Sequence, residues 1–388
     1  MRITKSFTKE NYDKTKKILI YGAGNYGQIA LFGLKSMGIM PDFFVDKNHA
    51  EEMYYGVKVI APEEVTKYKN DIFLIASLNY FFDIMEILNE KNVENYFDIE
   101  RLIEICPDYS LNEYALDEKN NIEKYRGVIN NYNLGKVIIG HVEVVLTEKC
   151  TLRCKDCANL MQYYSKPENL DLNEIIRTFD NFLETIDLLL ELRLLGGEPF
   201  LITDIDKIVD YYSNNEKVKR ITIYTNSTII PKQNVINSLK NEKVVIHMSD
   251  YEFSNKVKEL DSLFKENKIN HYVHAYEQWN DLGSLSKREY SDDVLKKLYE
   301  ECLMSKCYTF YRGKLFLCPR SAHGERLGCF KNTKKEYIDF NEMTDKIESK
   351  RENVIELISN TRVLTACNYC NGSCVRSNKV SAAIQLKR

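Results

Sequence analysis

The stretch CTLRCKDC, residues 150–157, holds three closely spaced cysteines, Cys150, Cys154 and Cys157. Thiolates are soft ligands, so three of them on one loop suit a zinc ion or an iron–sulfur cluster. A structural zinc site normally takes four ligands and would need a partner from elsewhere. An iron–sulfur cluster held by three thiolates instead leaves one iron open, and an open iron is a place for chemistry.

Composition limits what these thiols can be. The chain has 388 residues, 44% of them hydrophobic, and a formal net charge of -3, which gives no sign of a nucleic-acid or acidic-lipid partner. The sequence has neither a secretory signal nor an apolar run long enough to span a membrane, so we expect a cytoplasmic protein. In that reducing compartment the 11 cysteines suit metal binding or burial better than disulfides.

Alternating strands and helices over residues 136–290 must position the cysteine loop. Such βα repeats predict a parallel sheet curled into a partial (β/α)6 barrel, with the site at the C-terminal ends of the strands. The loop follows the first of these strands directly. The candidate strands are residues 137–147, 189–199, 218–227, 243–250 and 270–279.

Period-two alternation in these strands places pairs of polar side chains on one face. An inward Glu143 or Arg193 is a candidate for substrate binding, because charged side chains are seldom buried unpaired. A buried ion pair or an outward face is the alternative. The pairs are His141 with Glu143, Glu191 with Arg193, and His247 with Ser249.

The N-terminal residues 1–115 have the pattern of a Rossmann-like α/β domain. An apolar strand precedes a G-x-G-x-x-G turn and a helix, and Asp46 ends the second strand. Glycines let the backbone approach a pyrophosphate at a helix N-terminus, and the acid can bind a ribose diol. The segment is either a nucleotide-binding domain or an inert docking domain with the same fold. The glycines are Gly22, Gly24 and Gly27.

A polar, Asn-rich stretch, residues 116–135, is predicted to be a linker between this domain and the barrel. The segment 291–388 differs from both, because it contains most of the cysteines. We expect three domains, 1–115, 136–290 and 291–388, with an α/β fold in the first two.

Two motifs resemble the radical S-adenosylmethionine (radical SAM) superfamily. CTLRCKDC matches the C-x3-C-x2-C loop of that family, and GGEP at residues 196–199 matches its motif on the second barrel strand. The resemblance implies that Cys150, Cys154 and Cys157 ligate a 4Fe-4S cluster whose open iron binds the amino and carboxylate groups of SAM. Reduction of SAM would then give a 5'-deoxyadenosyl radical that removes hydrogen from an unactivated C–H bond.

The same resemblance assigns roles to residues at the ends of the strands. Gly196, Gly197 and Glu198 would hold the amino group of SAM, with the glycines leaving backbone space beside the ligand. Asn226 and Ser249 occupy positions that often touch SAM in this family. The residue before the third cysteine is usually aromatic in the family, but here it is Asp156; adenine is then held by Asp156 itself or by Tyr163 and Tyr164, or Asp156 points to solvent.

The C-terminal segment resembles the auxiliary-cluster domains called twitch or SPASM. The spacing from the first cysteine through Gly313 to Cys318, followed by C-x2-C, implies a second 4Fe-4S cluster of the shorter twitch type. Its ligands would be Cys318, Cys367 and Cys370, plus either Cys302 or Cys307. A zinc site built from the same thiols is the alternative.

Cys329 has no place in either cluster. It is either a buried small side chain or the donor of a hydrogen atom that quenches a substrate radical, as an epimerase requires.

We therefore expect a radical SAM enzyme of the oxidoreductase or epimerase type. It would act on a polar small molecule such as a sugar or nucleotide-sugar, with a reductant such as flavodoxin or ferredoxin and without nucleic-acid or membrane partners. Peptide modification is the rival activity, and a non-catalytic zinc scaffold is the rival of another class.

Overall fold

The computed structural model describes residues 4–78, 80–131, 136–251, 253–342, 346–359, 363–374 and 377–387. The chain divides into two compact units, Met1–Lys136 and Val137–Arg388. Among the described residues, no helix has the length and apolar character needed to cross a bilayer.

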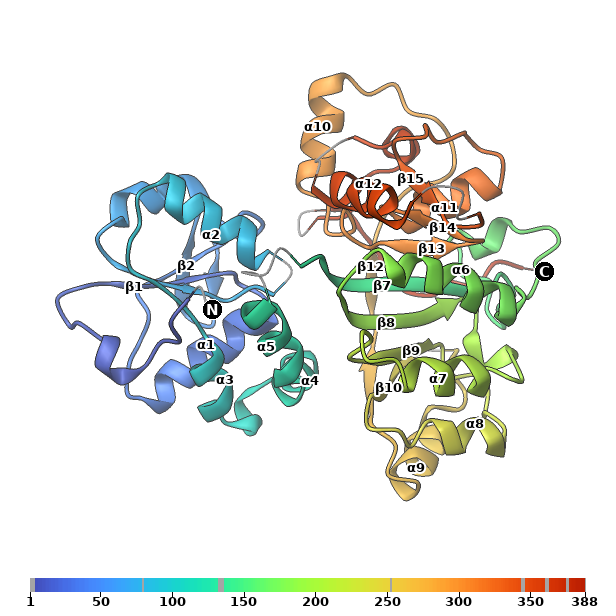
Figure 1. Cartoon of the computed structure of the whole chain (residues 1–388), viewed down its shortest axis with the longest axis horizontal. Helices are drawn as coiled ribbons and strands as arrows, with labels where there is room; N and C mark the ends of the chain where they lie inside the picture. The colour runs from blue at the N-terminus through green and yellow to red at the C-terminus, as the bar shows by residue number, and fades with distance from the viewer. Residues whose placement is uncertain are drawn as a thin grey trace. The chain divides into compact units, whose positions relative to one another are not determined.

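The first unit is built on one sheet with the strand order β3-β4-β2-β1-β5-β6 (Figure 1). All strands except the short edge strand β3 run parallel, and the order from β4 to β6 is that of a doubly wound nucleotide-binding sheet. The strands are β1 Ile18–Tyr21, β2 Phe43–Val45, β3 Met53–Tyr54, β4 Val57–Ile60, β5 Ile72–Ile75 and β6 Tyr96–Asp98.

Helices cover both faces of this sheet. Figure 1 shows α2 on the opposite side of the sheet from α1 and α3. The central strands β1 and β5 are completely buried, which explains why they are continuous apolar runs in the sequence. The helices are α1 Asn25–Ser36, α2 Phe81–Glu90, α3 Glu100–Ile105, α4 Glu113–Asn120 and α5 Ile122–Asn131.

The stretch predicted to be a linker, residues 116–135, is helical as far as residue 131. Helix α4 begins after Asn112, whose side chain accepts a hydrogen bond from the backbone N–H of Ala115. Tyr125 in α5 is completely buried, and its hydroxyl accepts from the backbone N–H of Ile99. The linker prediction is therefore wrong here, because a few buried side chains hold a mostly polar helix in place. Residues 132–135 lie outside the described residues.

The second unit is built on an eight-stranded sheet with the order β11-β10-β9-β8-β7-β13-β14-β15. Its first five strands are parallel and are connected by helices, as the βα pattern predicts. In chain order, these strands and helices are β7 Ile138–Thr147, α6 Leu172–Glu184, β8 Leu188–Gly196, α7 Asp206–Ser213, β9 Ile221–Thr225, α8 Gln233–Ser238, β10 Val244–Asp250, α9 Val257–Glu266 and β11 His271–Ala275.

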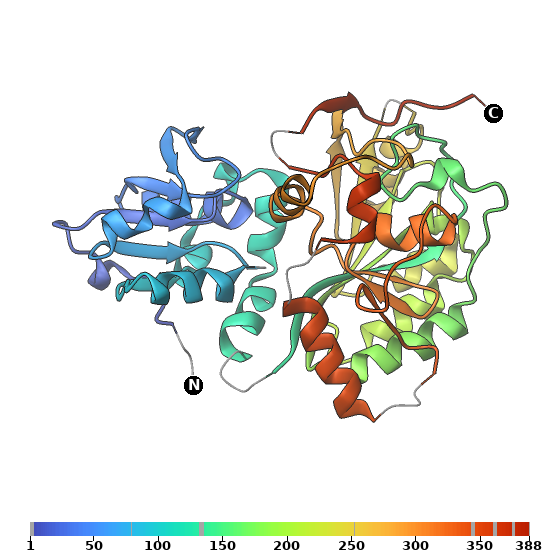
Figure 2. The ribbon, with the colours of Figure 1, turned by 90° about the horizontal axis from the view of Figure 1, so that it is seen from above.

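The sixth parallel strand differs from the expected (β/α)6 order. It is β13, which comes from the C-terminal segment and pairs with the outer edge of β7 instead of following β11. The C-terminal segment thus extends the same sheet and adds helices beside it (Figure 2). Its elements are β12 Gln278–Asn280, α10 Asp292–Glu300, β13 Thr309–Tyr311, β14 Lys314–Phe316, α11 Pro319–Arg326, β15 Tyr337–Asp339, α12 Ile347–Ser359 and β16 Lys379–Ser381.

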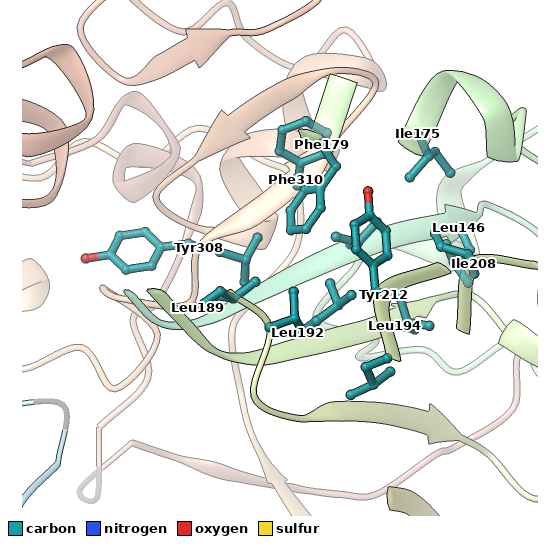
Figure 3. Packing of buried hydrophobic residues seen from close by; sticks show 14 of the residues in the cluster. Leu146, Ile175, Phe179, Leu189, Leu192, Leu194, Ile208, Tyr212, Tyr308 and Phe310 are labelled. Atoms are coloured by element: carbon teal, nitrogen blue, oxygen red, sulfur yellow. The ribbon is translucent and has the colours of Figure 1, made fainter. Parts of the chain in front are cut away.

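One face of this sheet packs against α6 and α7 to form the hydrophobic core. Phe179 of α6 lies at its centre, with ring contacts to Phe182, Tyr212 and Phe310 (Figure 3). Leu192 and other alternate residues of the strands fill the space below these rings. Because this face is apolar, the polar residues that alternate with it must lie on the other face.

Candidate active site

Three thiols follow the C-terminal end of β7. Cys150, Cys154 and Cys157 are all free, and side-chain amides direct N–H groups at two of them. Nδ2 of Asn226 lies 3.5 Å from Sγ of Cys150, and Nε2 of Gln385 lies 3.2 Å from Sγ of Cys154. An N–H group stabilises a thiolate more than a thiol, so these contacts suit metal ligands.

Burial makes these thiols hard to ionise by themselves. It raises the pKa of Cys150 to about 12 and the pKa of Cys154 to about 11, and it also raises the pKa of Cys157. Thiols with such a high pKa keep their protons at neutral pH unless a cation replaces them. The loop therefore fits a group that brings positive charge, as an iron–sulfur cluster does.

Glu198 joins the ends of two strands beside this loop. The carboxylate is completely buried and accepts hydrogen bonds from the backbone N–H of Asn226 at 2.8 Å, the backbone N–H of Phe200 at 3.1 Å and the hydroxyl of Thr225 at 2.8 Å. Burial raises its pKa to about 7, although the three hydrogen bonds act to lower it. Its predicted contact with the amino group of SAM stays a prediction.

The two glycines of the GGEP turn face protein backbone. A Cβ atom on Gly197 would lie 1.9 Å from the carbonyl oxygen of Lys149, and one on Gly196 would lie 2.3 Å from that of Thr147. Gly196 also has a φ of +139°. Backbone atoms of Thr147 and Lys149 fill the space that we predicted beside a ligand. The glycines therefore allow the GGEP turn to contact the segment that leads into the cysteine loop.

Asn226 and Ser249 differ in how they face the loop. The side chain of Asn226 donates to the hydroxyl of Thr151 at 3.0 Å, in addition to its contact with Cys150. Ser249 is buried at the end of β10, and its carbonyl oxygen accepts from the hydroxyl of Ser254. Asn226 therefore supports the cysteine loop directly, and contact of either residue with SAM stays a prediction.

The last residues of the chain also hold the cysteine loop, which the sequence did not predict. The backbone N–H of Lys155 donates to the carbonyl of Ile384, and that of Leu386 donates to the carbonyl of Arg153. Gln385, between them, donates its amide N–H to Cys154. No motif marks a ligand-supporting glutamine some 230 residues away, so only the fold could reveal it.

The structure separates the alternatives around Asp156. Oδ2 of Asp156 is buried and has no hydrogen-bond partner among the described residues. Tyr164 donates or accepts at Nδ1 of His323, 2.8 Å away, and Tyr163 is largely exposed. Asp156 is therefore the one of these three residues with an unused polar atom next to the thiols.

The polar face of the sheet carries a charged group in the predicted register. His141 lies opposite Glu191, and Glu143 lies opposite Arg193. Nη2 of Arg193 lies 2.9 Å from Glu191, whereas its Nη1 lies 3.9 Å from Glu143. The alternative of a buried ion pair is thus confirmed for Arg193 and Glu191, and burial raises the pKa of Glu143 to about 7.

A second group of thiols gathers around Cys318, at the start of α11. Its pKa is raised by burial and then by the neighbouring thiols of Cys302, Cys370 and Cys367. The thiol of Cys302 is in turn close to those of Cys370 and Cys374. The thiols of Cys302, Cys318, Cys367 and Cys370 therefore lie near one another, and we call these four the C-terminal thiol group.

Cys307 points elsewhere. Its pKa is raised by burial, then by Glu143, while Arg193 lowers it and Cys302 contributes least. Of the two candidates for the fourth position in the C-terminal thiol group, the geometry favours Cys302.

Cys329 lies near one buried cation. The guanidinium of Arg320 acts to lower the pKa of Cys329 and also that of Cys157. Arg320 is buried and donates to the carbonyls of Gly283, Ser284 and Tyr369. A role of Cys329 as a hydrogen donor stays a prediction.

In the first unit, the residues of the glycine loop pack against one another and against neighbouring backbone. Gly22 has a φ of +115° and lies close to the carbonyl of Ala76, and Gly27 packs against the carbonyl of Gly22. Oδ2 of Asp46 accepts from the backbone N–H of Ala23 at 2.9 Å, whereas a Cβ on Gly24 would meet nothing within 4 Å. Asp46 therefore supports the loop itself, and its contact with a nucleotide stays a prediction.

Comparison with known families matches two parts of the chain. Residues 144–288 match the model described as the radical SAM superfamily, and residues 14–97 match the model described as C2185-like, N-terminal. The first match contains both the cysteine loop and the GGEP turn.

Curated relatives are similar over about a quarter of the chain. GTP 3',8-cyclase of Stenotrophomonas maltophilia (strain R551-3) is 31% identical over 94 residues, which cover 24% of this chain and 28% of that protein. The mitochondrial GTP 3',8-cyclase of Arabidopsis thaliana is 32% identical over 95 residues, 24% of each chain. The chain thus matches less than a third of the length of these relatives.

Solved structures resemble the chain at low identity. The enzyme anSMEcpe with bound AdoMet and the Cp18Cys peptide is 16% identical, with a TM-score of 0.40, over 64% of this chain and 92% of that chain. BtrN in complex with AdoMet and 2-DOIA is 14% identical, with a TM-score of 0.36, over 60% and 93%.

The buried His247 predicts a pH dependence of stability. Burial lowers its pKa from 6.5 to about 3, and its two nitrogens face the hydroxyls of Tyr272 and Tyr276 at 3.0 and 3.1 Å. Below pH 6.5 the unfolded chain takes up a proton that the folded chain does not, so stability falls as pH falls.

Lowering the pH from 6.5 to 5.0 should lower the free energy of unfolding of the wild type. In His247→Gln we expect this decrease to be smaller by about 2 kcal/mol, because the histidine is absent. Urea unfolding followed by fluorescence of Trp279, the only tryptophan, measures this in the second unit. Equal pH slopes in the two proteins would contradict it.

Proposed function

Because residues 144–288 of the chain are a radical SAM domain, we propose that Cys150, Cys154 and Cys157 hold the 4Fe-4S cluster and that the strand ends around them bind SAM. The observation that carries this proposal is the pair of amide N–H groups directed at buried thiols that cannot ionise without a cation. When bound, such a cluster supplies one electron to SAM, and the cleaved cofactor removes a hydrogen atom from substrate.

The protein's part is to position and shield these groups. Glu198 is a buried acid close to Cys150 that can meet an ammonium group, and its pKa of about 7 would fall next to a cation. Asp156 offers its unpartnered oxygen to the exocyclic amine of adenine, in place of the stacking aromatic residue of the family. Asn226 fixes the loop against β9.

An auxiliary cluster on the C-terminal thiol group is the second part of the proposal. A zinc ion with thiolates at about 2.3 Å brings their sulfurs within about 3.8 Å of one another. Among the described residues, no three of these sulfurs lie within 4.8 Å of one another, although three other side chains, described below, do. The wider spacing favours an iron–sulfur cluster over zinc, because a cluster is larger than one ion.

For the reaction, an auxiliary cluster favours oxidation of the substrate. It can accept the electron that a substrate radical loses when it becomes a carbonyl, so we propose dehydrogenation of a polar metabolite, with epimerisation as the alternative. The substrate is a sugar or nucleotide-sugar; the name of the relatives, GTP 3',8-cyclase, supports a nucleotide in that class. A flavodoxin- or ferredoxin-type reductant would supply the first electron.

Peptide modification is less well supported. Relatives of that kind usually carry a winged-helix-like recognition domain, whereas the first unit here is a parallel α/β sheet with a glycine loop. The sheet is the place that we propose for the nucleotide part of the substrate.

Anaerobic protein with reductant and SAM should form 5'-deoxyadenosine, measured by chromatography. The triple variant Cys150→Ala, Cys154→Ala, Cys157→Ala should lose at least about 100-fold of this activity and its share of iron, since no cluster can be held. Cys106→Ala, in the buried interior of the first unit, is the matched control and should keep both. A triple variant as active as wild type would contradict the proposal.

The C-terminal thiol group can be tested by counting iron. Cys302→Ala should lower bound iron, by up to about four atoms per chain, because Cys302 lies near Cys318 and the loss of one of four ligands weakens the binding of the cluster. Cys307→Ala, which removes a thiol that faces Glu143, should leave iron unchanged. The reverse result would make Cys307 the ligand, and zinc in place of iron in the wild type would contradict the cluster.

Deuterated water separates the two reactions. With SAM and a panel of nucleotide-sugars, dehydrogenation gives a product that has lost two hydrogens and carries no solvent deuterium, and Cys329→Ala should not change it. A product with one deuterium that disappears in Cys329→Ala would instead show epimerisation, with the Cys329 thiol as the hydrogen donor. Mass spectrometry measures both the loss of hydrogen and the gain of deuterium. If no nucleotide-sugar were turned over, this would contradict the proposed substrate class.

A further inference from the structure

Three ligand-type side chains meet on the polar face of the sheet, away from both groups of thiols described above. One atom each of His141, Glu143 and Cys307 lies within 4.8 Å of the other two. Among the residues that the structure describes, this is the one group of three or more His, Cys, Asp or Glu side chains so close together. All three residues are buried or partly buried.

The sheet itself brings these side chains together. His141 and Glu143 alternate along β7, so they share one face. Glu143 is level with Thr309 of the neighbouring parallel strand β13, and Cys307 precedes Thr309 by two residues. Cys307 therefore stands level with His141 at the spacing of adjacent strands, about 4.8 Å. Cys307 itself lies in the segment between α10 and β13, and the pairing of β13 with β7 brings the end of this segment beside His141.

Glu143 has fewer partners than the other acid on this face, Glu191. Nε and Nη2 of Arg193 both donate to Glu191, at 3.0 and 2.9 Å, and the buried Arg220 lies 3.8 Å from the same carboxylate. Glu143 has only the more distant Nη1 of Arg193, at 3.9 Å, and accepts no hydrogen bond among the described residues. The thiol of Cys307 makes only a long contact, 4.0 Å, to the carbonyl of Leu303.

We propose that His141, Glu143 and Cys307 bind one zinc ion. Imidazole nitrogen, carboxylate oxygen and thiolate sulfur are the three donors that zinc accepts in proteins. A carboxylate and a thiolate together carry two negative charges, which neutralise a divalent ion. Zinc bonds of about 2.0 to 2.3 Å place ligand atoms about 3.3 to 3.8 Å apart, so the three side chains need only small movements to bind.

Three protein ligands would leave the fourth tetrahedral position of the zinc ion without a protein ligand. Three protein ligands and an open position are typical of sites that bind water or an exchangeable ligand, whereas purely structural zinc sites are closed by four. The guanidinium of Arg193, 3.9 Å from Glu143, lies close to the proposed ligands.

The test uses the full-length protein with its iron–sulfur clusters, incubated anaerobically with one equivalent of zinc chloride and desalted. Zinc K-edge X-ray absorption observes zinc without interference from iron. We expect about one zinc per chain, with a single sulfur neighbour at about 2.3 Å and nitrogen or oxygen neighbours at about 2.0 to 2.1 Å. Four sulfur neighbours, which would place zinc in the C-terminal thiol group, or no retained zinc would overturn the proposal.

Variants identify the ligands. Cys307→Ser should remove the sulfur neighbour and lower retained zinc at least about tenfold, and His141→Gln should lower it similarly while leaving iron unchanged. Cys106→Ser removes a buried cysteine of the first unit and should retain both the zinc and its sulfur neighbour. An unchanged zinc spectrum in Cys307→Ser would overturn the site. Loss of iron in Cys307→Ser would make Cys307 a ligand of the auxiliary cluster and would overturn it as well.

Discussion

The close approach of two backbone segments at the C-terminal ends of β7 and β8 is the constraint on which the site depends. The N–H groups of Gly197 and Glu198 donate to the carbonyls of Thr147 and Lys149, at 2.8 and 2.9 Å. A side chain at Gly196 or Gly197 would collide with these carbonyls. The pairing fixes the start of the cysteine loop and, through Glu198, the end of β9.

From this contact the environment of the thiols follows. The loop is held on one side by Asn226, at the end of β9, and on the other by the backbone around Gln385 near the end of the chain. Both supports end in N–H groups that point at sulfur. Hydrogen bonds to the sulfurs are among the factors that set the reduction potential of an iron–sulfur cluster, so the same contacts that position the loop would also tune the cluster that we propose there.

The sheet of the second unit has an apolar face and a polar face. One face packs against α6 and α7 around Phe179, and the other carries charged residues in level rows across neighbouring strands. A row of charges inside a protein is costly unless each charge has a partner. Glu191 is 2.9 Å from Arg193 and 3.8 Å from Arg220, whereas Glu143 has only the more distant Arg193, at 3.9 Å.

Strand β13 changes what that polar face can do. Because it pairs with the open edge of β7, it brings the C-terminal segment beside the first strand of the sheet. Two cysteines that precede β13 then have different environments. Cys302 turns towards Cys318, Cys367 and Cys370, whereas Cys307, five residues later, faces Glu143.

The sequence by itself determined the features that depend on local spacing. The cysteine loop, the GGEP turn, the glycine turn of the first unit and the five strands from β7 to β11 are all visible as short patterns, because residues close in sequence have few ways to be arranged. The pairing of Glu191 with Arg193 was also open to prediction as one alternative, since period-two alternation and parallel pairing place them on one face.

Only the tertiary structure decided the features that depend on contacts between distant segments. The different surroundings of Cys302 and Cys307, the support of Cys154 by Gln385, and the place of β13 at the edge of β7 are examples. The helices α4 and α5 are another, because their polar sequences become ordered through buried side chains such as Tyr125. In each case the free energy comes from burial and hydrogen bonds across the fold, which no local pattern records.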